Sequence, residues 1–249
     1  DIFAAEFLKL FEEFSIFGGY PRVVLSEAEI EKKKILNDIY SNYILKDIKG
    51  LLELATDKNL LDLTRFLATQ AGNILVYKNL SQIARLDYRK TIEHLRILEE
   101  TFVIELARPY FKNRQKELVK NPKVYFIDAG FRNGLMENMN LFSKRSDTGA
   151  LVENVVFLRL KILLENFHKI NFWRSKAGAE VDFIIDLNGE IFPIEVKFSE
   201  FDKPEISRSL AGFIKSFKTK RALVLTKDYF GFAKTKTGCE VLFWPVYYF

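Results

Sequence analysis

Two acidic residues lie where a predicted β-hairpin would bring them together. Apolar and polar residues alternate over Val181–Leu187 and Glu190–Phe198, and an Asn-Gly step stands between these runs. Asn-Gly favours a two-residue turn, because both turn residues must take positive φ, and the resulting register places Asp182 opposite Glu195. Directly opposed side chains on one face have Cβ atoms about 5 Å apart. We therefore expect two carboxylates that repel each other unless a positive charge lies between them.

A lysine completes this cluster. Glu195 and Lys197 are two residues apart on one strand, so both side chains point to the same face. Carboxylates suit a hard cation such as Mg²⁺ (or Mn²⁺), and a nearby lysine can orient or deprotonate water or stabilise charge on a phosphate. The alternative is a structural ion pair between Glu195 and Lys197 on a half-exposed strand.

Glu153 is a candidate third acid. The sequence predicts a helix over Thr148–Phe167, and at 100° per residue Glu153 falls inside its apolar arc. An acid on a buried face needs a partner or a purpose. Glu153 could instead favour the helix dipole in the first turn or pair with Arg174. The polar face of this helix is expected at Asn154, Lys161 and Glu165.

The elements around the hairpin are also predicted. A first strand is expected over Ile170–Arg174, and two later strands over Arg221–Thr226 and Glu240–Trp244. A second helix is expected to start with a capping box made by Asp202 and Glu205, with Pro204 in its first turn. Its core stripe would consist of Ile206, Leu210, Phe213, Ile214 and Phe217.

The spacing Asp-x12-Glu-x-Lys resembles the PD-(D/E)XK nuclease motif, and the order helix, three strands, helix, strand is that of the restriction-endonuclease-like fold. In that fold a helix before the hairpin often supplies one more acid, and Glu153 matches this place. The resemblance implies that Asp182 and Glu195 hold a Mg²⁺ (or Mn²⁺) ion, that Glu153 assists as a metal ligand, and that Lys197 is catalytic beside them.

The first half of the chain reads as helical. Residues 1–60 form a helical segment, with a helix over Asp1–Phe14, a turn at the Gly-Gly-Tyr-Pro step and a charged helix from Glu27 to about Leu54. Residues 61–128 are expected to form a winged helix-turn-helix, and residues 129–147 a linker helix. The three helices of the winged unit are expected over Leu63–Gly72, Ser81–Leu86 and Tyr88–Glu100, followed by strands over Phe102–Leu106 and Val124–Ile127.

The third of these helices could enter a DNA major groove. Asp87 would cap it, and Ile92, Leu95 and Leu98 would pack inward. The side chains offered to DNA would be Tyr88, Arg89, Lys90, Thr91, His94 and Arg96, with Lys112, Arg114, Lys116 and Lys120 on the following loop. The alternative is a packing module, because acidic residues dilute this charge at Glu93, Glu99, Glu100 and Glu117.

Composition narrows the function classes. The 249 residues carry a net charge of +5, which permits a polyanionic partner without requiring one. The single cysteine, Cys239, excludes an internal disulfide and any cysteine-rich zinc site. We expect a cytoplasmic protein with no membrane contact, because no apolar stretch approaches a membrane span and no signal-like segment opens the chain.

A wider resemblance covers nearly the whole chain. The stretches FGGYPRVV, YILKDI, NPKVYFIDAGFRNGL, GALVENVVFLRL and FWRSKAGAEVDFII…FPIEVKFS are similar, in that order, to prokaryotic AAA-type ATPases whose C-terminal region is a domain of unknown function. In that family an ATPase module precedes a winged helix and a restriction-endonuclease-like domain. The chain has no G-x-x-x-x-G-K-[ST] loop and begins with Asp1, so we expect a fragment that lacks the ATPase core.

The family resemblance implies that the chain has an α+β multidomain fold and ends in a nuclease-like domain over residues 148–249. Arg174 and Lys176 would contact phosphate, DNA and the missing ATPase module would be partners, and ATP would act only in a full-length protein. A homo-oligomer is left open. The function expected is a Mg²⁺-dependent nuclease, and the alternative is a catalytically inactive module that binds DNA or protein for the ATPase.

Overall fold

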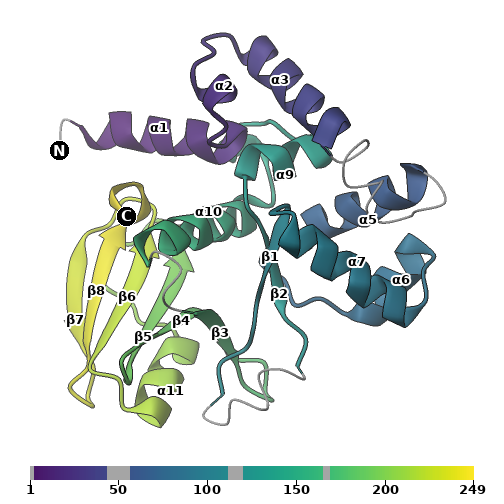
Figure 1. Cartoon of the computed structure of the whole chain (residues 1–249). Coiled ribbons are helices and arrows are strands. Elements are labelled where there is room, and N and C mark those ends of the chain that lie inside the picture. Colours follow the sequence, from purple (N-terminus) through teal and green to yellow (C-terminus); the bar gives the residue numbers. More distant parts are fainter. Residues whose placement is uncertain (1–2, 44–56, 112–119, 165–168) are drawn as a thin grey trace. The chain divides into compact units, whose positions relative to one another are not determined.

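The structure is a computed structural model that describes residues 3–43, 57–111, 120–164 and 169–249 (Figure 1). Helices and strands are mixed, as the α+β class predicted. The chain forms two compact units, which are described separately. Unit 1 comprises Asp1–Lys9, Ala107–Lys120 and Asp147–Phe249, and unit 2 comprises Leu10–Leu106 and Asn121–Ser146.

Helices make up most of unit 2. The helices are α1 (Ala4–Phe17, which begins in unit 1), α2 (Pro21–Val24), α3 (Glu29–Asn42), α5 (Asp57–Thr69), α6 (Tyr77–Ala84), α7 (Tyr88–Glu100) and α9 (Ala129–Leu135), with a 3-10 turn at Phe142–Lys144. Strands β1 (Ile104–Ala107) and β2 (Lys123–Phe126) form a two-stranded sheet. Three helices followed by two strands is the predicted order. The expected helix from Glu27 to Leu54 is seen only to Asn42, since its remainder lies outside the described residues.

In helix α7 the local sequence determines the bounds of the helix, and tertiary packing determines which of its side chains are buried. It spans the predicted residues, because the Asp87 side chain caps it by accepting a hydrogen bond from the Lys90 amide at 2.9 Å. Leu95 and Leu98 are buried in the core of unit 2 as expected, but Ile92 is exposed, so its predicted inward packing is wrong. The inward position is taken by Thr91, whose hydroxyl donates to the Asp87 carbonyl oxygen.

Unit 1 is built on a six-stranded sheet with the strand order β3-β4-β5-β6-β8-β7. Its strands are β3 (Ile170–Arg174), β4 (Glu180–Leu187), β5 (Glu190–Lys197), β6 (Arg221–Thr226), β7 (Gly231–Lys234) and β8 (Glu240–Pro245), and a 3-10 turn follows at Val246–Tyr248. Strands β3, β4 and β5 form an antiparallel meander, whereas β5, β6 and β8 are parallel. Only β7, an antiparallel edge strand, was not predicted.

The sheet of unit 1 is covered by one helix on each face (Figure 1). Phe157 of α10 (Thr148–Leu163) contacts Phe183 of β4, with the ring centroids 6.2 Å apart. On the other face α11 (Arg208–Phe217) packs through Phe213, which shares a core cluster with Ile184. Successive residues of a strand point to opposite faces, so these contacts define three layers.

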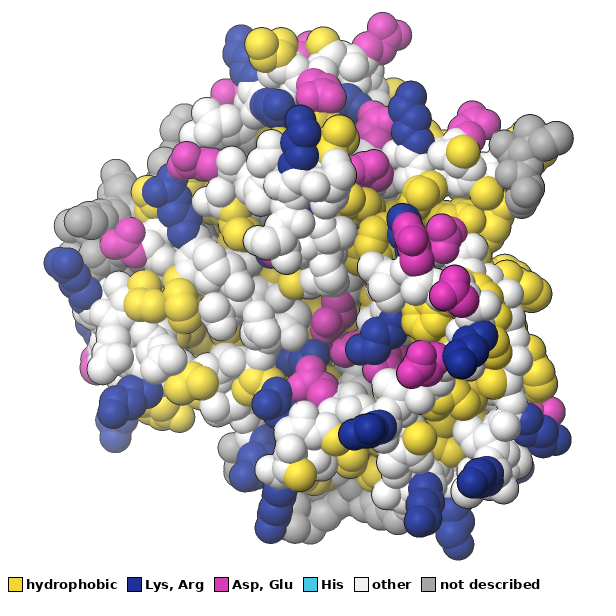
Figure 2. Space-filling view, turned by 180° about the vertical axis from the view of Figure 1, so that it is seen from behind, with side chains coloured by type: hydrophobic (Ala, Val, Ile, Leu, Met, Phe, Trp, Pro, Cys, Tyr) yellow, Lys and Arg dark blue, Asp and Glu magenta, His cyan; other side chains and the backbone are white. Residues whose placement is uncertain are grey.

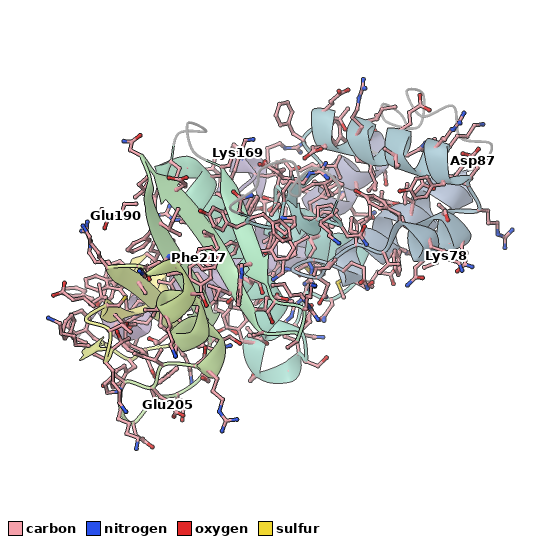
Figure 3. The ribbon with its side chains drawn as sticks, turned by 90° about the horizontal axis from the view of Figure 1, so that it is seen from below. Lys78, Asp87, Lys169, Glu190, Glu205 and Phe217 are labelled. Carbon is pink, nitrogen blue, oxygen red and sulfur yellow. The ribbon has the colours of Figure 1, made fainter. Side chains whose placement is uncertain are left out.

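Two local predictions in unit 1 are wrong. Helix α11 begins at Arg208 rather than near Asp202, because Ser207 is its N-cap and accepts from the Leu210 amide at 3.1 Å. Glu205 lies on the loop before the helix and Phe217 at its last turn against the sheet (Figure 3). On α10, Asn154 is fully buried rather than on a polar face, because this helix is buried around most of its circumference.

Candidate active site

The hairpin between β4 and β5 has the geometry that its turn residues require. Asn188 and Gly189 both have positive φ, 56° and 92°, and Leu187 pairs with Glu190 as predicted. The register continues without a shift past Pro193 and ends at the pair Phe183–Ile194. The candidate acids therefore lie one step further on, where the paired ladder stops.

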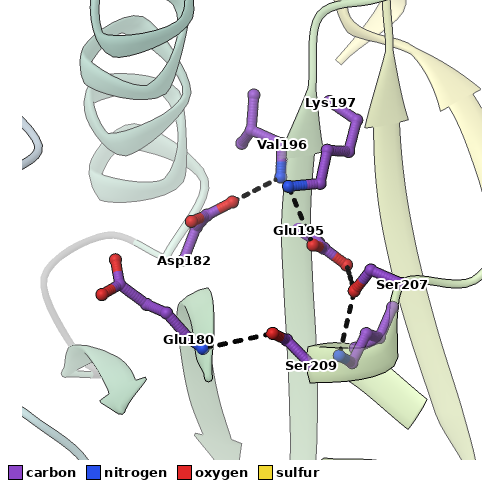
Figure 4. A network of polar contacts seen from close by, with 8 residues as sticks. Glu180, Asp182, Glu195, Val196, Lys197, Ser207 and Ser209 are labelled. Carbon is purple, nitrogen blue, oxygen red and sulfur yellow. Dashed lines mark hydrogen bonds and ion pairs between the residues drawn. The ribbon is translucent and has the colours of Figure 1, made fainter. Parts of the chain in front are cut away.

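Asp182 bridges the point where the two strands part. Its Oδ2 accepts a hydrogen bond from the Val196 amide at 2.8 Å (Figure 4). This contact ties the Asp182 carboxylate to β5 next to Glu195, on the strand that it was predicted to face. The half-buried side chain is thus held at the end of the ladder rather than directed into solvent.

Glu195 is the most deeply buried member of the cluster, with 3% of its side chain exposed. Its Oε1 pairs with the Lys197 ammonium at 3.1 Å, and its Oε2 accepts from the Ser207 hydroxyl at 2.8 Å (Figure 4). Both partners of Glu195 are therefore side chains, on β5 and at the start of α11. Sequence reasoning did not identify Ser207, although a serine before an apolar helical stripe is a standard N-cap signal.

Lys197 faces three acids. Burial lowers the pKa of its ammonium, but the ion pair and hydrogen bond with Glu195 and the charges of Asp182 and Glu153 outweigh burial and raise the pKa. Lys197 is therefore protonated at neutral pH. The distant helix α10 does bring Glu153 close enough to act on this lysine electrostatically.

Glu153 itself is half-buried rather than enclosed in the apolar arc. The alternative pairing with Arg174 is not formed, since Arg174 pairs with Glu180 at 2.8 Å. Within the described ranges, no group of three or more Asp, Glu, His or Cys side chains is arranged to hold a metal ion. The predicted three-acid ligand set is therefore not assembled by the side chains as they stand.

Asp182 and Glu195 nevertheless offer a donor set that fits Mg²⁺. This ion is commonly bound through one or two carboxylates and keeps several waters. Glu153 would then contribute through water.

A pocket of about 350 Å³ opens beside this cluster. Glu195, Lys197 and Val224 line its base, and the connection between β5 and α11 forms its walls. The side chains of this connection include three acids, Glu200, Asp202 and Glu205, together with Lys203. The cluster is thus accessible from solvent on the side of α11.

The residues predicted to contact phosphate differ in exposure and pairing, and some lie outside the described residues. Lys176 is exposed on the turn between β3 and β4, and Arg174 is exposed but already pairs with Glu180. Lys112 and Arg114, with the neighbouring Lys116, lie outside the described residues. The stretch from Arg108 to Tyr110, expected in a wing loop, instead runs beside β3, where the Tyr110 amide donates to the Phe172 carbonyl oxygen.

Helix α7 of unit 2 offers part of its predicted DNA-contacting set. Arg89 and Lys90 are exposed at its start, and Arg96 is exposed but pairs with Glu100 at 3.0 Å. Thr91 and His94 are buried, so neither can contact a groove. The His94 Nδ1 lies 2.6 Å from the Lys90 carbonyl oxygen.

Charge on the visible surface is mixed. Figure 2 shows Lys and Arg side chains interspersed with Asp and Glu rather than gathered in one basic field.

In the part of the chain that the structure describes, no helix is both long and apolar enough to cross a membrane.

Comparison with known proteins finds relatives without an assigned activity. An uncharacterized protein of Haemophilus influenzae is 24% identical over 240 residues, which cover 94% of this chain and 56% of the relative. One from the archaeon Methanocaldococcus jannaschii is 26% identical over 223 residues, covering 86% of this chain and 48% of the relative. An uncharacterized protein of Mycobacterium tuberculosis is 27% identical over 150 residues, which cover 58% of this chain and 33% of the relative. The chain thus spans about half the length of the first two relatives.

No solved structure matches the chain significantly. Two family models match it in succession. Residues 148–247, which carry the sheet and the acidic cluster, match a family described as Domain of unknown function (DUF4143). Residues 8–142, more than half of the chain, match a second family. The chain therefore belongs to the family described as Domain of unknown function (DUF8612).

Proposed function

We propose that unit 1 is a Mg²⁺-dependent nuclease that hydrolyses DNA phosphodiester bonds, with a restriction-endonuclease-like fold. The observation that carries this proposal is the arrangement of Asp182, Glu195 and Lys197 where β4 and β5 part. A buried carboxylate paired with a protonated lysine, beside a second acid and an open pocket, is typical of phosphate chemistry.

Asp182 and Glu195 would hold the ion, which when bound supplies Lewis acidity toward the phosphate and a more acidic water. The raised pKa of Lys197 supports a role as a fixed positive charge that stabilises the phosphate in the transition state, rather than as a base that takes a proton from water. In the reaction the water oxygen would bond to phosphorus and lose a proton to solvent, while the bond from phosphorus to the leaving sugar oxygen breaks and that oxygen takes up a proton from solvent.

The test is cleavage of supercoiled plasmid and single-stranded DNA with Mg²⁺ or Mn²⁺. Asp182→Asn should reduce cutting by about 100-fold or more, as should Lys197→Ala. Asp186→Asn is the matched control, because Asp186 lies on the same strand and also accepts a backbone hydrogen bond, from Gly189 at 2.7 Å. Lys203→Ala controls for loss of a lysine that lines the same pocket. Cutting that is equal in Asp182→Asn and Asp186→Asn would refute the site.

A second candidate is a catalytically inactive module that binds DNA or protein for an attached ATPase. Both Glu195 oxygens already have side-chain partners, and the described residues offer no three-acid metal group, which favours this candidate. The family that residues 148–247 match, DUF4143, is often found with AAA ATPases, which supports an ATPase partner for either candidate. Full-length protein with ATP would distinguish a dormant nuclease from an inactive one.

In either case we propose that unit 2 is a winged helix whose α7 contacts DNA. Arg89→Ala with Lys90→Ala should weaken DNA binding and reduce its salt dependence by about two phosphate contacts. Arg96→Ala should have less effect, because its guanidinium is already paired with Glu100. Equal salt slopes in the parent and the double variant would assign unit 2 to packing or protein contact instead.

A further inference from the structure

The first turn of α11 touches both strands of the candidate site. The Ser207 hydroxyl donates to Glu195 Oε2 on β5, and two residues later the Ser209 hydroxyl oxygen accepts from the Glu180 amide on β4 at 3.3 Å (Figure 4). These contacts lie beside Asp182, where the strands have ceased to pair. The start of a helix thus braces the strands at this point.

Ser207 also has a second contact. While its hydroxyl proton goes to Glu195, its oxygen accepts from the Leu210 amide at 3.1 Å as the N-cap of α11. A hydroxyl has one donor and two acceptor positions, so both bonds can exist at once. The same hydroxyl oxygen therefore caps the start of α11 and, through its proton, binds the Glu195 carboxylate.

Glu195 needs such a contact because its side chain has several rotatable bonds. Lys197 binds one oxygen, and an ion pair through one oxygen leaves the carboxylate plane free to turn. The Ser207 bond holds the other oxygen, so the carboxylate is fixed at two points. Groups that bind metal ligands in this way are known to set the orientation and affinity of the ligand.

We propose that Ser207 is a positioning residue for Glu195, through which α11 holds the carboxylate in its metal-binding orientation. This inference rests on the proposed metal site and extends it to a residue outside the Asp, Glu and Lys motif. A purely capping role predicts that only helix stability depends on Ser207. A positioning role predicts that metal affinity depends on it as well.

The experiment measures Mn²⁺ binding to the whole chain by electron paramagnetic resonance, without nucleic acid, alongside thermal unfolding. Ser207→Gly removes the donor to Glu195 but keeps most of the capping preference, since glycine is tolerated at N-caps. It should bind Mn²⁺ about 10- to 100-fold more weakly than the parent, with little change in Tm. Ser207→Thr keeps both bonds and should bind like the parent. Ser209→Ala removes only the contact with β4 and keeps both contacts of Glu195, so its Mn²⁺ affinity should fall much less than that of Ser207→Gly.

The inference would be overturned if Ser207→Gly bound Mn²⁺ as tightly as the parent, and the proposed nuclease would remain intact. It would also be overturned if Ser207→Thr bound Mn²⁺ as weakly as Ser207→Gly. Asp182→Asn separates these outcomes from failure of the metal site. If the parent does not bind Mn²⁺, or binds it no better than Asp182→Asn, the metal-dependent function is refuted and the role of Ser207 with it.

Discussion

Asp128 and Glu195 are carboxylates in the two units, and they differ in their partners. Asp128 of unit 2 accepts hydrogen bonds from the backbone amides of Gly19 at 2.8 Å and Phe131 at 2.7 Å. Glu195 of unit 1 is held by two side chains, Lys197 and Ser207. The two donors to Asp128 are backbone amides, whereas Lys197 and Ser207 reach Glu195 through rotatable side chains. We therefore expect Asp128 to contribute to stability and Glu195 to contribute to the proposed metal-dependent chemistry.

The surroundings of Asp128 agree with this assignment. It is the N-cap of α9 and joins that helix to the glycine turn after α1, 109 residues earlier in the chain. Gly18 has φ +76°, and a Cβ on it would lie 2.2 Å from the Asp128 carboxylate. The Gly-Gly and Asp-Ala-Gly stretches of the sequence are thus two sides of one close contact.

Among the variants that test the contrast between Asp128 and Glu195, Glu195→Gln is expected to have the largest effect. The isosteric amide removes the charge that pairs with Lys197, so DNA cleavage should fall by about 100- to 1,000-fold while the protein stays folded. A plasmid-cleavage assay measures the loss of activity, and thermal unfolding shows whether the protein stays folded. Glu190→Gln, on the same strand but paired with Arg221 at the surface, is the control. Full activity in Glu195→Gln would place Glu195 with Asp128 as a structural acid.

Gly130→Ala should give the next largest effect, on stability alone. A Cβ on Gly130 would lie 1.9 Å from the Phe17 carbonyl oxygen, so backbone would have to move, at a cost of about 3 kcal/mol. Chemical denaturation measures this change. Gly134→Ala on the same helix meets only Met139 Cε at 3.6 Å and should instead stabilise by about 0.5–1 kcal/mol. Equal stability of both variants would show that α9 and the glycine turn are not in close contact.

Asp128→Ala should destabilise the fold by about 1–2 kcal/mol, because α9 loses its cap and the Gly19 amide loses its partner. Asp87→Ala removes a cap with no long-range contact and should cost less. Mn²⁺ binding should be unchanged in both variants. A large loss of Mn²⁺ affinity in Asp128→Ala would contradict its purely structural role.

The smallest effect concerns pH. Burial raises the pKa of Asp128, and this outweighs the hydrogen bonds from Gly19, Phe131 and Gly130, which lower it. A carboxyl with a raised folded pKa binds its proton more tightly in the folded state, so its contribution to stability falls as pH rises from about 3.9, its unfolded value, through the folded pKa. The destabilisation caused by Asp128→Ala should therefore be larger below this window than above it, as measured by denaturation across pH. The opposite slope would refute the raised pKa.

Local signals determined much of unit 1. The Asn-Gly turn and the period-two pattern specified the hairpin, its register and the neighbouring positions of Asp182 and Glu195, because turn geometry and side-chain alternation are properties of short segments. The same holds for α7, where the Asp87 cap and a leucine stripe are sufficient. These features could be predicted because they depend on residues within a few positions of one another.

Only the tertiary structure decided which partners these groups take. The choice of Glu195 over Asp182 as the partner of Lys197 depends on where the ladder ends, and the role of Ser207 depends on where α11 returns to the sheet. The burial of Thr91 and Asn154, and the contact between Asp128 and Gly19, depend on elements that are distant in sequence. Periodicity assigns a residue to a face, but hydrogen bonds between distant segments are determined only when those segments pack.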